Sequence, residues 1–354
     1  MDSSSRSVLH VLPHPGGGAE TYVDGLEGLP GYSHRRVALS VTRGRLRGSA
    51  SVLRRRRRIL ALAREADVVH VHGDMAAMLV APALRGAALV ITGQGLHRLR
   101  RTDGVPGWLL RRRLTQAVGA SVRTILSAED ERDDLAAALP AALHERLVVI
   151  HNGVPVPPPP DPERRTRLRR ELGVADAEVA ALFVGRLEPR KDPLGAIAAV
   201  EAARAGGAEL ALLIAGDGPL EEEVRARAGS GIHALGHRED VEDLYTAADL
   251  FVLPSRREGM SLALIEAMAH GLVPLVAAGS GSDEAVADAG IVVAGGDVEA
   301  LAAALARLAA DGDERQRLGA AARARLESEL SVERFRERTA AQYETALAAA
   351  AQGA

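Results

Sequence analysis

Residues 250–271 read LFVLPSRREGMSLALIEAMAHG, and this stretch predicts a buried strand, a loop and a helix in immediate succession. The apolar run Leu250–Leu253 has the length of a short strand that is buried on both faces. A helix is expected from about Ser261 to His270, and Gly271 ends it because glycine readily adopts the left-handed conformation after a helix. A strand followed directly by a helix is the repeating unit of a parallel sheet with helices on both faces.

The start of this helix offers a site for an anion, because its free backbone N–H groups and its dipole favour negative charge by about 0.3–1 kcal/mol. These N–H groups belong to Gly259, Met260, Ser261 and Leu262. Glu258 lies beside the anion, and Glu266 follows about two turns into the helix. A carboxylate does not attract phosphate, so each glutamate is expected to accept hydrogen bonds from sugar hydroxyls. Two unrelated surface glutamates are the alternative.

An earlier strand ends in the loop GRLEPRKD at residues 185–192. Of the 44 basic residues in the chain, Lys191 is the single lysine. Either this lysine survived by chance, or its position needs a compact ammonium that a planar guanidinium cannot replace. Arg186 and Lys191 at the carboxyl end of a strand suit an anionic ligand such as a phosphate. An ion pair with Glu188 or Asp192 is the alternative for either cation.

The alternation of short apolar runs and helical patterns extends along the chain and predicts an α/β fold. Strands are expected at residues 7–12, 36–41, 67–72, 87–92, 122–127, 147–151, 180–184, 210–215, 232–235, 250–253, 273–276 and 290–293. Residues from about 297 to 349 are expected to be helical. The alternation stops at Pro157–Pro160, because four prolines cannot continue a helix or a central strand.

We therefore expect two doubly wound, Rossmann-like domains, with a ligand in the cleft between them at the carboxyl ends of their strands. The first domain is expected to span residues 1–152 together with a C-terminal helix at 331–354, and the second to span 153–330. The charge distribution supports this division, because residues 1–157 hold 22 basic and 14 acidic residues and the remainder holds 22 and 33.

Composition excludes several classes of protein. The net charge of −3 is too close to zero for non-specific binding of nucleic acid, and the absence of cysteine rules out disulfides and thiolate chemistry. No apolar run approaches the roughly 18 residues that span a bilayer, and residues 1–18 lack the apolar core of a signal peptide. We expect a cytoplasmic protein, with peripheral contact to the inner surface of a membrane left open.

The ordered set of motifs resembles the retaining glycosyltransferases of family four, which have the two-domain GT-B fold. The resemblance covers nearly the whole chain and depends on the order of short motifs, each weak alone. The motifs are GGGAE (16–20), DVVHVHG (67–73), HNGV (151–154), VGRL (184–187) with Lys191, AGDGP (215–219), LGHR (235–238) and the two glutamates seven residues apart.

The resemblance implies a role for each matching position. Arg186 and Lys191 would hold the diphosphate of the donor, Glu258 the hydroxyls of the transferred sugar, and Glu266 the ribose. The backbone at Gly185 and at Gly259–Leu262 would contact phosphate and sugar, and residues near Gly216, Arg238 and Val241 would line the base. Gly16 and Gly17 would approach the diphosphate from the first domain, and the C-terminal helix would cross back to that domain.

The implied chemistry is transfer of a sugar from a nucleoside diphosphate sugar, with UDP favoured over GDP or ADP, to a small-molecule, glycan or lipid acceptor. The departing diphosphate gains negative charge, and Arg186, Lys191 and a helix start supply enough positive charge to make a metal dispensable. Neither a cofactor nor a metal is therefore expected. Attack on the same face of the sugar, with the leaving phosphate accepting the proton, would retain the configuration.

One position departs from the family pattern. Where the family often has a His-Gly pair near the transferred sugar, this chain has Gln94 and Gly95, with His97 close by. Gln94 cannot act as a base, so His97 or a backbone amide would have to serve on this side. His70 and His72 share one face of their strand, but two ligands are too few for a metal site.

The run Arg54–Arg58 lies among apolar residues and indicates an amphipathic helix. A solvated helix in an arginine-rich chain and a patch for a membrane surface both fit this pattern. For the chain as a whole, the alternatives to a transferase are a GT-B-type sugar-nucleotide epimerase and a non-catalytic protein that binds sugar nucleotides. A nicotinamide dehydrogenase is disfavoured, because Thr21 stands where the last glycine of G-x-G-x-x-G should be.

Overall fold

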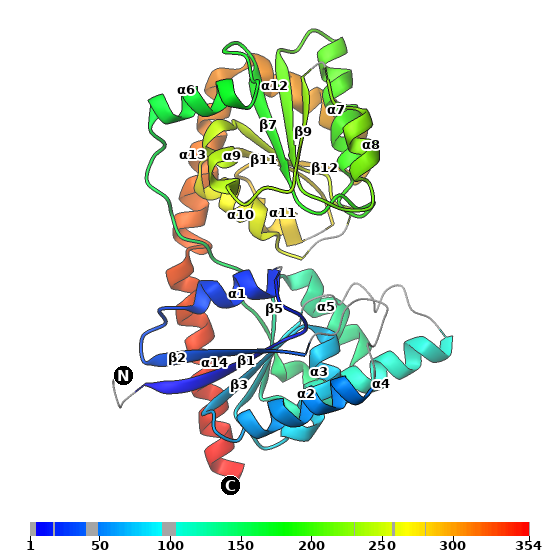
Figure 1. Cartoon of the computed structure of the whole chain (residues 1–354), viewed down its shortest axis with the longest axis vertical. Helices are drawn as coiled ribbons and strands as arrows, with labels where there is room; N and C mark the ends of the chain where they lie inside the picture. The colour runs from blue at the N-terminus through cyan, green and yellow to red at the C-terminus, as the bar shows by residue number, and fades with distance from the viewer. Residues whose placement is uncertain are drawn as a thin grey trace. The chain divides into compact units, whose positions relative to one another are not determined.

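The computed structural model describes residues 5–16, 18–39, 49–93, 104–229, 231–256, 259–279 and 281–353. The chain forms two compact units, of which the first comprises Met1–Asn152 with Val332–Ala354 and the second Gly153–Ser331. Each unit is a parallel sheet with helices on both faces, which confirms the expected α/β class (Figure 1). None of the described helices combines the length and the apolar character that crossing a bilayer requires.

In its described part, the first unit has a six-stranded sheet in the order β2-β1-β3-β4-β5-β6. Its strands are β1 (Arg6–Leu12), β2 (Tyr32–Ala38), β3 (Val68–His72), β4 (Leu89–Thr92), β5 (Arg123–Leu126) and β6 (Leu147–Val149). Its helices are α1 (Gly18–Leu26), α2 (Ser49–Leu62), α3 (Asp74–Val80), α4 (Gly104–Ala120), α5 (Glu129–Ala138) and α14 (Val332–Gly353), with 3₁₀ turns at Ala81–Leu84 and Ala141–Arg146.

The two faces of this sheet bury different side chains, because successive residues of a strand point to opposite sides. On one face, Leu9 and Val69 pack with apolar residues of α2, α3 and α4. On the other face, Val8 and Val68 pack against α1 and against Tyr343 of α14. Helix α14 therefore belongs to the core of the first unit, although it follows the second unit in the sequence.

In its described part, the second unit has a six-stranded sheet in the order β12-β11-β10-β7-β8-β9. Its strands are β7 (Val179–Val184), β8 (Leu210–Ala215), β9 (Ile232–Gly236), β10 (Leu250–Leu253), β11 (Val273–Ala277) and β12 (Ile291–Val293). Its helices are α6 (Pro162–Glu171), α7 (Pro193–Ala205), α8 (Glu221–Ala226), α9 (Val241–Ala247), α10 (Leu262–Ala269), α11 (Gly281–Val286), α12 (Val298–Ala310) and α13 (Gly312–Glu329).

The predicted strands are all present, and β2 shows the largest displacement. The sequence predicts a strand at 36–41, whereas the structure has Tyr32–Ala38. After Tyr32 this strand has four consecutive polar residues, Ser33 to Arg36, which apolar patterning does not detect. It lies at the edge of the sheet, where part of the strand stays exposed, so its first residues do not have to be apolar.

Candidate functional site at the carboxyl edge of the second sheet

The strand order of the second unit reverses beside β7. From β7 the chain proceeds through β8 to β9 on one side, and β10, β11 and β12 lie on the other side. In open α/β sheets, ligands bind outside the carboxyl ends of the strands at such a switch point. The loops that follow β7 and β10 are therefore neighbours here, and the backbone N–H of Arg256 donates to the carbonyl of Arg190 at 3.1 Å.

Close packing of the loops after β7 and β8 requires glycine. The left-handed backbone at Gly216 has φ of 149°, and a Cβ there would lie 1.9 Å from the carbonyl oxygen of Gly185. At Gly218, a Cβ would lie 2.5 Å from the carbonyl oxygen of Leu187. The Leu187 N–H in turn donates to the carbonyl of Asp217 at 2.7 Å. The two loops thus form one backbone layer at this edge of the sheet.

Lys191 lies within this layer and is only 9% exposed. Its Cε would be 3.7 Å from a Cβ at Gly185, so the lysine stem passes close to the backbone at the end of β7. Arg186 is more exposed, and its Nη1 is 3.8 Å from a carboxylate oxygen of Asp217. Arg190 binds Glu188 at 2.8 Å, and the Asp192 carboxylate accepts from the N–H of Gly195 at 3.2 Å.

Helix α10 follows the loop after β10, which contacts the β7 loop through Arg256 and Arg190. Ser261 is the N-cap residue, and its extended backbone (φ −70°, ψ 123°) ends the β10 loop without a hydrogen bond from its own side chain to the helix. Met260 and Ser261 are both buried. The helix ends at Ala269 and is followed by Gly271 with φ of 76°, as the sequence predicted. Glu258 lies outside the described residues.

Glu266 lies on α10 and is oriented by a tyrosine that the sequence motif did not indicate. The hydroxyl of Tyr245, on α9, donates to Glu266 Oε2 at 2.8 Å. Burial raises the pKa of the Glu266 carboxyl, and the hydrogen bond from Tyr245 partly opposes this effect. Burial also raises the pKa of the Tyr245 hydroxyl well above its usual range, so the tyrosine stays a hydrogen-bond donor.

Gly216 and Arg238, which were predicted to border the base of the sugar nucleotide, lie along the same edge of the sheet. Gly216 follows β8, and its N–H donates to the carbonyl of Gly236 at the end of β9 at 2.8 Å. Arg238, two residues further on, forms a two-point contact with Asp240 that includes an Nε–Oδ1 distance of 2.7 Å. The guanidinium of Arg238 is thus oriented by its own loop.

The predicted residues of the first unit are only partly described. Gly16 has φ of 79°, and its N–H donates to the carboxylate of Glu20 in the first turn of α1. A Cβ at Gly16 would meet no described atom within 4 Å, so the backbone there is open to an approaching group. Gly17, Gln94 and His97 lie outside the described residues.

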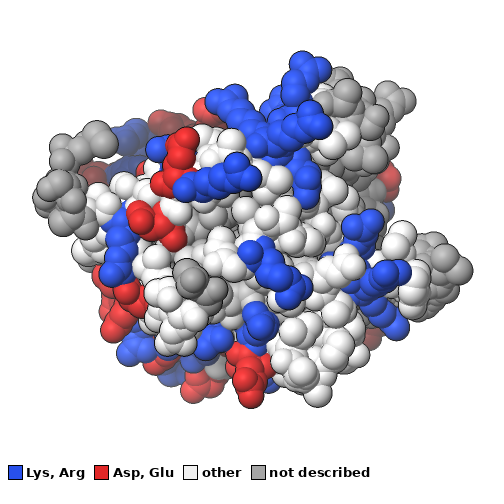
Figure 2. All heavy atoms as spheres, turned by 90° about the horizontal axis from the view of Figure 1, so that it is seen from below, with Lys and Arg blue, Asp and Glu red and all other residues white. Residues whose placement is uncertain are grey.

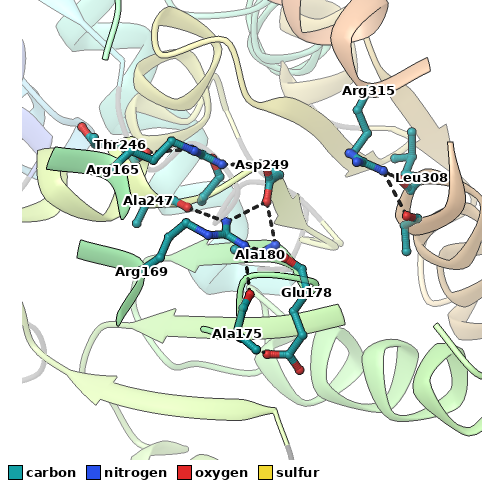
Figure 3. Close-up of polar contacts among 12 residues, drawn as sticks. Arg165, Arg169, Ala175, Glu178, Ala180, Thr246, Ala247, Asp249, Leu308 and Arg315 are labelled. Carbon is teal, nitrogen blue, oxygen red and sulfur yellow. Dashed lines mark hydrogen bonds and ion pairs between the residues drawn. The ribbon is translucent and has the colours of Figure 1, made fainter. Parts of the chain in front are cut away.

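A polar pocket of about 350 Å³ lies at the opposite edge of the second sheet. Arg165 and Arg169 of α6 converge there on Asp249, at 2.6 and 3.1 Å, and the Asp249 carboxylate also accepts from the N–H of Ala180 at 2.8 Å (Figure 3). Further hydrogen bonds join the two arginines to backbone carbonyls, including that of Ala247. These guanidinium groups fasten α6 to the sheet, so the carboxyl edge is the better candidate for ligand chemistry.

Three residues near the candidate sites escaped the sequence analysis. Tyr245 has no signal, because its partnership with Glu266 depends on the packing of α9 against α10. Ser255 is 1% exposed, and its hydroxyl has no hydrogen-bond partner among the described residues. Its place two residues after β10 was the only indication in the sequence. His10 belongs to a histidine cluster in the first unit, and only strand register shows that association.

Comparison with protein families accounts for both units. Residues 9–156 match the family described as Glycosyltransferase Family 4, and residues 164–325 match the one described as Glycosyl transferases group 1. Among solved structures, HepE of Anabaena in complex with UDP-glucose superimposes with a TM-score of 0.79 at 18% identity, over 95% of this chain and 98% of the other. Sucrose-phosphate synthase of Thermosynechococcus elongatus gives 0.79 at 19% identity, over 97% and 100%.

The fold is the GT-B arrangement of two Rossmann-like domains. The two matches cover most of the chain between them, and they show that it is a glycosyltransferase of the family-four type.

Two relatives show how far the similarity in sequence extends. A GDP-mannose-dependent mannosyltransferase of monoacylated phosphatidylinositol monomannoside from Corynebacterium glutamicum is 34% identical over 187 residues, 49% of each chain. A D-inositol 3-phosphate glycosyltransferase of Streptomyces bingchenggensis is 32% identical over 235 residues, 58% of this chain and 49% of the relative. The matched region thus spans about half the length of these relatives.

Proposed function

We propose that this protein transfers a sugar from a nucleoside diphosphate sugar to an acceptor, with the donor held at the carboxyl edge of the second sheet. The observation that carries the proposal is the meeting of the β7 loop, which bears Arg186 and Lys191, with the β10 loop that leads into α10. Membership of a glycosyltransferase family supports sugar transfer over epimerisation. The combination of the β7 and β10 loops, with Arg186, Lys191 and Glu266, supports it as well. A binding protein without activity would need the same donor site but no turnover.

The cations of this edge would stabilise the leaving group. As the bond between sugar and diphosphate breaks, negative charge grows on the phosphate oxygens. Lys191 is nearly buried and would act at short range, whereas the more exposed Arg186 would move from Asp217 to the phosphate. Together with the N–H groups at the start of α10, they would provide the positive charge, and we propose that no metal takes part.

The two glutamates would act on different parts of the donor. Glu266, oriented by Tyr245, would accept hydrogen bonds from the ribose, and Glu258 would bind the hydroxyls of the transferred sugar. Gly216 and Arg238 would border the base. We propose that the configuration is retained by attack on the same face of the sugar, as the family resemblance implies, with the departing phosphate accepting the proton of the acceptor.

The first property to establish is which nucleoside diphosphate sugar the protein binds. We propose a UDP-sugar, and the neighbouring structure with UDP-glucose supports this choice, while the GDP-mannose enzyme among the relatives makes GDP the main competitor. Thermal unfolding with UDP, GDP or ADP and their sugars should show stabilisation by one base, about 2.7 kcal/mol at a hundred times the dissociation constant. Transfer is then tested on inositol phosphates and lipid-linked inositol glycans, with the anomeric configuration of the product read by NMR.

The outcome separates the candidates. Stabilisation followed by a transferred product of retained configuration supports the proposal. Stabilisation with isomerised sugar nucleotide and no acceptor would indicate an epimerase, and stabilisation without any turnover would indicate a binding protein. Absence of stabilisation by every diphosphate would contradict a donor site at this edge.

We also propose that the acceptor is reached at a membrane surface. Helices α2 and α4 cover the same sheet face and contain no acidic residue. The arginines at 54, 55, 57, 58 and 111–113 are exposed, as are Leu53, Trp108 and Leu109. Figure 2 shows basic side chains gathered toward the upper right of the face, with acidic ones mostly at the left and lower edges. Basic and apolar groups together suit an anionic lipid surface.

Sedimentation with vesicles tests this part. The protein should bind vesicles containing anionic lipid but not neutral ones, and replacing Arg54, Arg55, Arg57 and Arg58 by Gln should weaken binding by roughly 1 kcal/mol per charge near the surface. Replacement of the exposed Arg132 and Arg334 by Gln serves as the control. Equal binding of the two variants would leave the α2 arginines as a solvated face only.

A further inference from the structure

A cluster of buried histidines lies in the first unit. His10 of β1 is paired in register with His70 of β3, and His72 follows two residues later on the same face. All three side chains are 0% exposed. His34 of β2 is half-buried and joins the cluster from the edge, since its Nδ1 lies 2.8 Å from His10 Nε2. The sequence suggested only His70 and His72, because the partner on β1 is set by strand pairing.

In the described part of the first unit, the imidazoles of His34, His10 and His72 form a chain of hydrogen bonds with an unsatisfied nitrogen at each end, His34 Nε2 and His72 Nδ1. His10 Nδ1 lies 3.0 Å from His72 Nε2, and His10 Nε2 contacts His34 as described above. In each pair, one ring nitrogen donates an N–H and the other accepts it. Whichever tautomers are present, His72 Nδ1 has no hydrogen-bond partner among the described residues. A buried nitrogen left without a partner costs about 1–3 kcal/mol. The contact to His10 is made by His72 Nε2, so a ligand bound through that atom would leave His72 Nδ1 unpaired, and the metal site is argued from the positions of the rings alone.

The geometry of three of these rings suits a metal ion. One ring nitrogen from each of His10, His70 and His72 can be chosen so that all lie within 4.8 Å of one another. The ring centroids are 4.1–5.4 Å apart. In a tetrahedral zinc site with Zn–N bonds of about 2.0–2.1 Å, ligand nitrogens are about 3.3 Å apart. The 3.0 Å separation of His10 Nδ1 and His72 Nε2 is already close to that spacing.

The surroundings would orient the ligands. The hydroxyl of Tyr343, on α14, lies 2.8 Å from His70 Nδ1. His34 has the same relation to His10 Nε2 at 2.8 Å. Histidines that bind metals usually hydrogen-bond through their other nitrogen, which sets the tautomer and the ring direction. The second nitrogen of His70 lies 2.7 Å from Thr92 Oγ1, so this hydroxyl would shift when His70 Nε2 binds an ion.

We propose that His10, His70 and His72 form a binding site for a zinc-type divalent transition metal in the core of the first unit. Three imidazoles without carboxylate or thiolate select borderline metals over Mg²⁺ and Ca²⁺. The site ties β1 and β3 together, and Tyr343 links it to α14. Its role is to stabilise the first unit, and it is independent of the donor chemistry proposed for the second.

The experiment uses the full-length chain without a polyhistidine tag, stripped of metal by a strong chelator at mildly denaturing temperature and then dialysed against Zn²⁺ or Co²⁺. We expect one tightly bound ion per chain by elemental analysis, visible absorption typical of low-coordinate Co²⁺, and a higher unfolding temperature with Zn²⁺. Mg²⁺ should produce none of these effects. Less than a tenth of an ion per chain, with no shift in unfolding, would overturn the proposal and leave a purely hydrogen-bonded cluster.

Variants locate the ion. His72→Gln should abolish stoichiometric binding, whereas His34→Gln keeps the three ligands and should lower affinity only about 10–100-fold. His237→Gln, an exposed histidine of the second unit, is the matched control and should bind as the unaltered chain does. If His72→Gln does not fold, the cobalt spectrum of the unaltered chain still decides. An ion retained equally by His72→Gln and His237→Gln would show that it binds elsewhere.

Discussion

Lys191 is the residue on which both composition and structure converge. A chain that uses arginine at 43 of its basic positions keeps lysine here, and the side chain runs beside the Gly185 backbone with little room around it. A guanidinium is wider and planar, so it would not occupy this path in the same way. The burial of the lysine explains why its charge would be effective on a phosphate group, since water screens it weakly.

Substitution of Lys191 should therefore affect the donor even when charge is kept. Lys191→Arg is expected to weaken nucleoside diphosphate binding or turnover, and Lys191→Ala to lose about 2–4 kcal/mol of transition-state stabilisation. Calorimetry and initial rates supply the two measurements. Arg227→Lys and Arg227→Ala, in an exposed pair with Glu201, are the controls and should leave both unchanged. Normal turnover in both Lys191 variants contradicts the phosphate role.

The two glutamates should separate in their effects on free diphosphate and on the intact donor. Glu266→Gln should weaken binding of the nucleoside diphosphate itself, because the ribose is present with or without the sugar. Glu258→Gln should leave that binding largely intact and reduce transfer or sugar selectivity. Titrating the diphosphate and the donor into each variant gives the comparison, with the exposed Glu201→Gln as control. The reverse pattern would exchange the two assignments.

The raised pKa of Glu266 predicts how donor binding depends on pH. Ribose hydroxyls donate to the ionised carboxylate, so binding favours deprotonation and lowers this pKa. The free protein therefore holds more protons than the complex, and affinity should decline as the pH falls to and below the raised pKa, approaching tenfold per pH unit. Glu266→Gln should remove this component and leave only the titration of the phosphate. Parallel pH profiles for the two proteins would mean that Glu266 does not meet the donor.

At the scale of elements, the loops after β7 and β8 depend on their glycines. Gly216→Ala introduces a methyl group 1.9 Å from the Gly185 carbonyl at φ of 149°, so the loops must separate. Backbone strain alone costs about 1–3 kcal/mol, and the clash adds to it. Chemical unfolding measures the loss. Gly207→Ala has a positive φ of 95° but no described atom within 4 Å, and thus isolates the strain. Equal losses in the two variants would show that close packing is unimportant.

At the scale of the whole molecule, donor chemistry should proceed without added metal. Diphosphate affinity and transfer rate are expected to persist in EDTA, since the cations are part of the protein. The unfolding temperature is recorded alongside, because removal of an ion from the histidine cluster would lower stability and rate together. A rate that vanishes in EDTA at unchanged unfolding temperature and returns with Mg²⁺ or Mn²⁺ would show that a metal bridges the diphosphate.

The strands, the loops at the carboxyl edge and the start of α10 could be predicted from the amino-acid sequence alone. Strands of a parallel sheet are buried on both faces, so runs such as Leu250–Leu253 stand out without any knowledge of their neighbours. Loops with special backbone needs carry glycine, and Gly216 and Gly271 marked their turns for this local reason. The edge strand β2 was placed less well because its burial is incomplete.

Which of these segments contact one another could be seen only in the folded chain. Strand order brings the β7 and β10 loops together, and packing of α9 on α10 supplies Tyr245 to Glu266. The register of β1 on β3 adds His10 to His70 and His72. These partners are far apart in the chain, and their meeting depends on the packing of whole sheets and helices. Local sequence patterns do not predict these contacts. Periodicity indicates which face of a helix or strand a residue occupies, but not which residue packs against it.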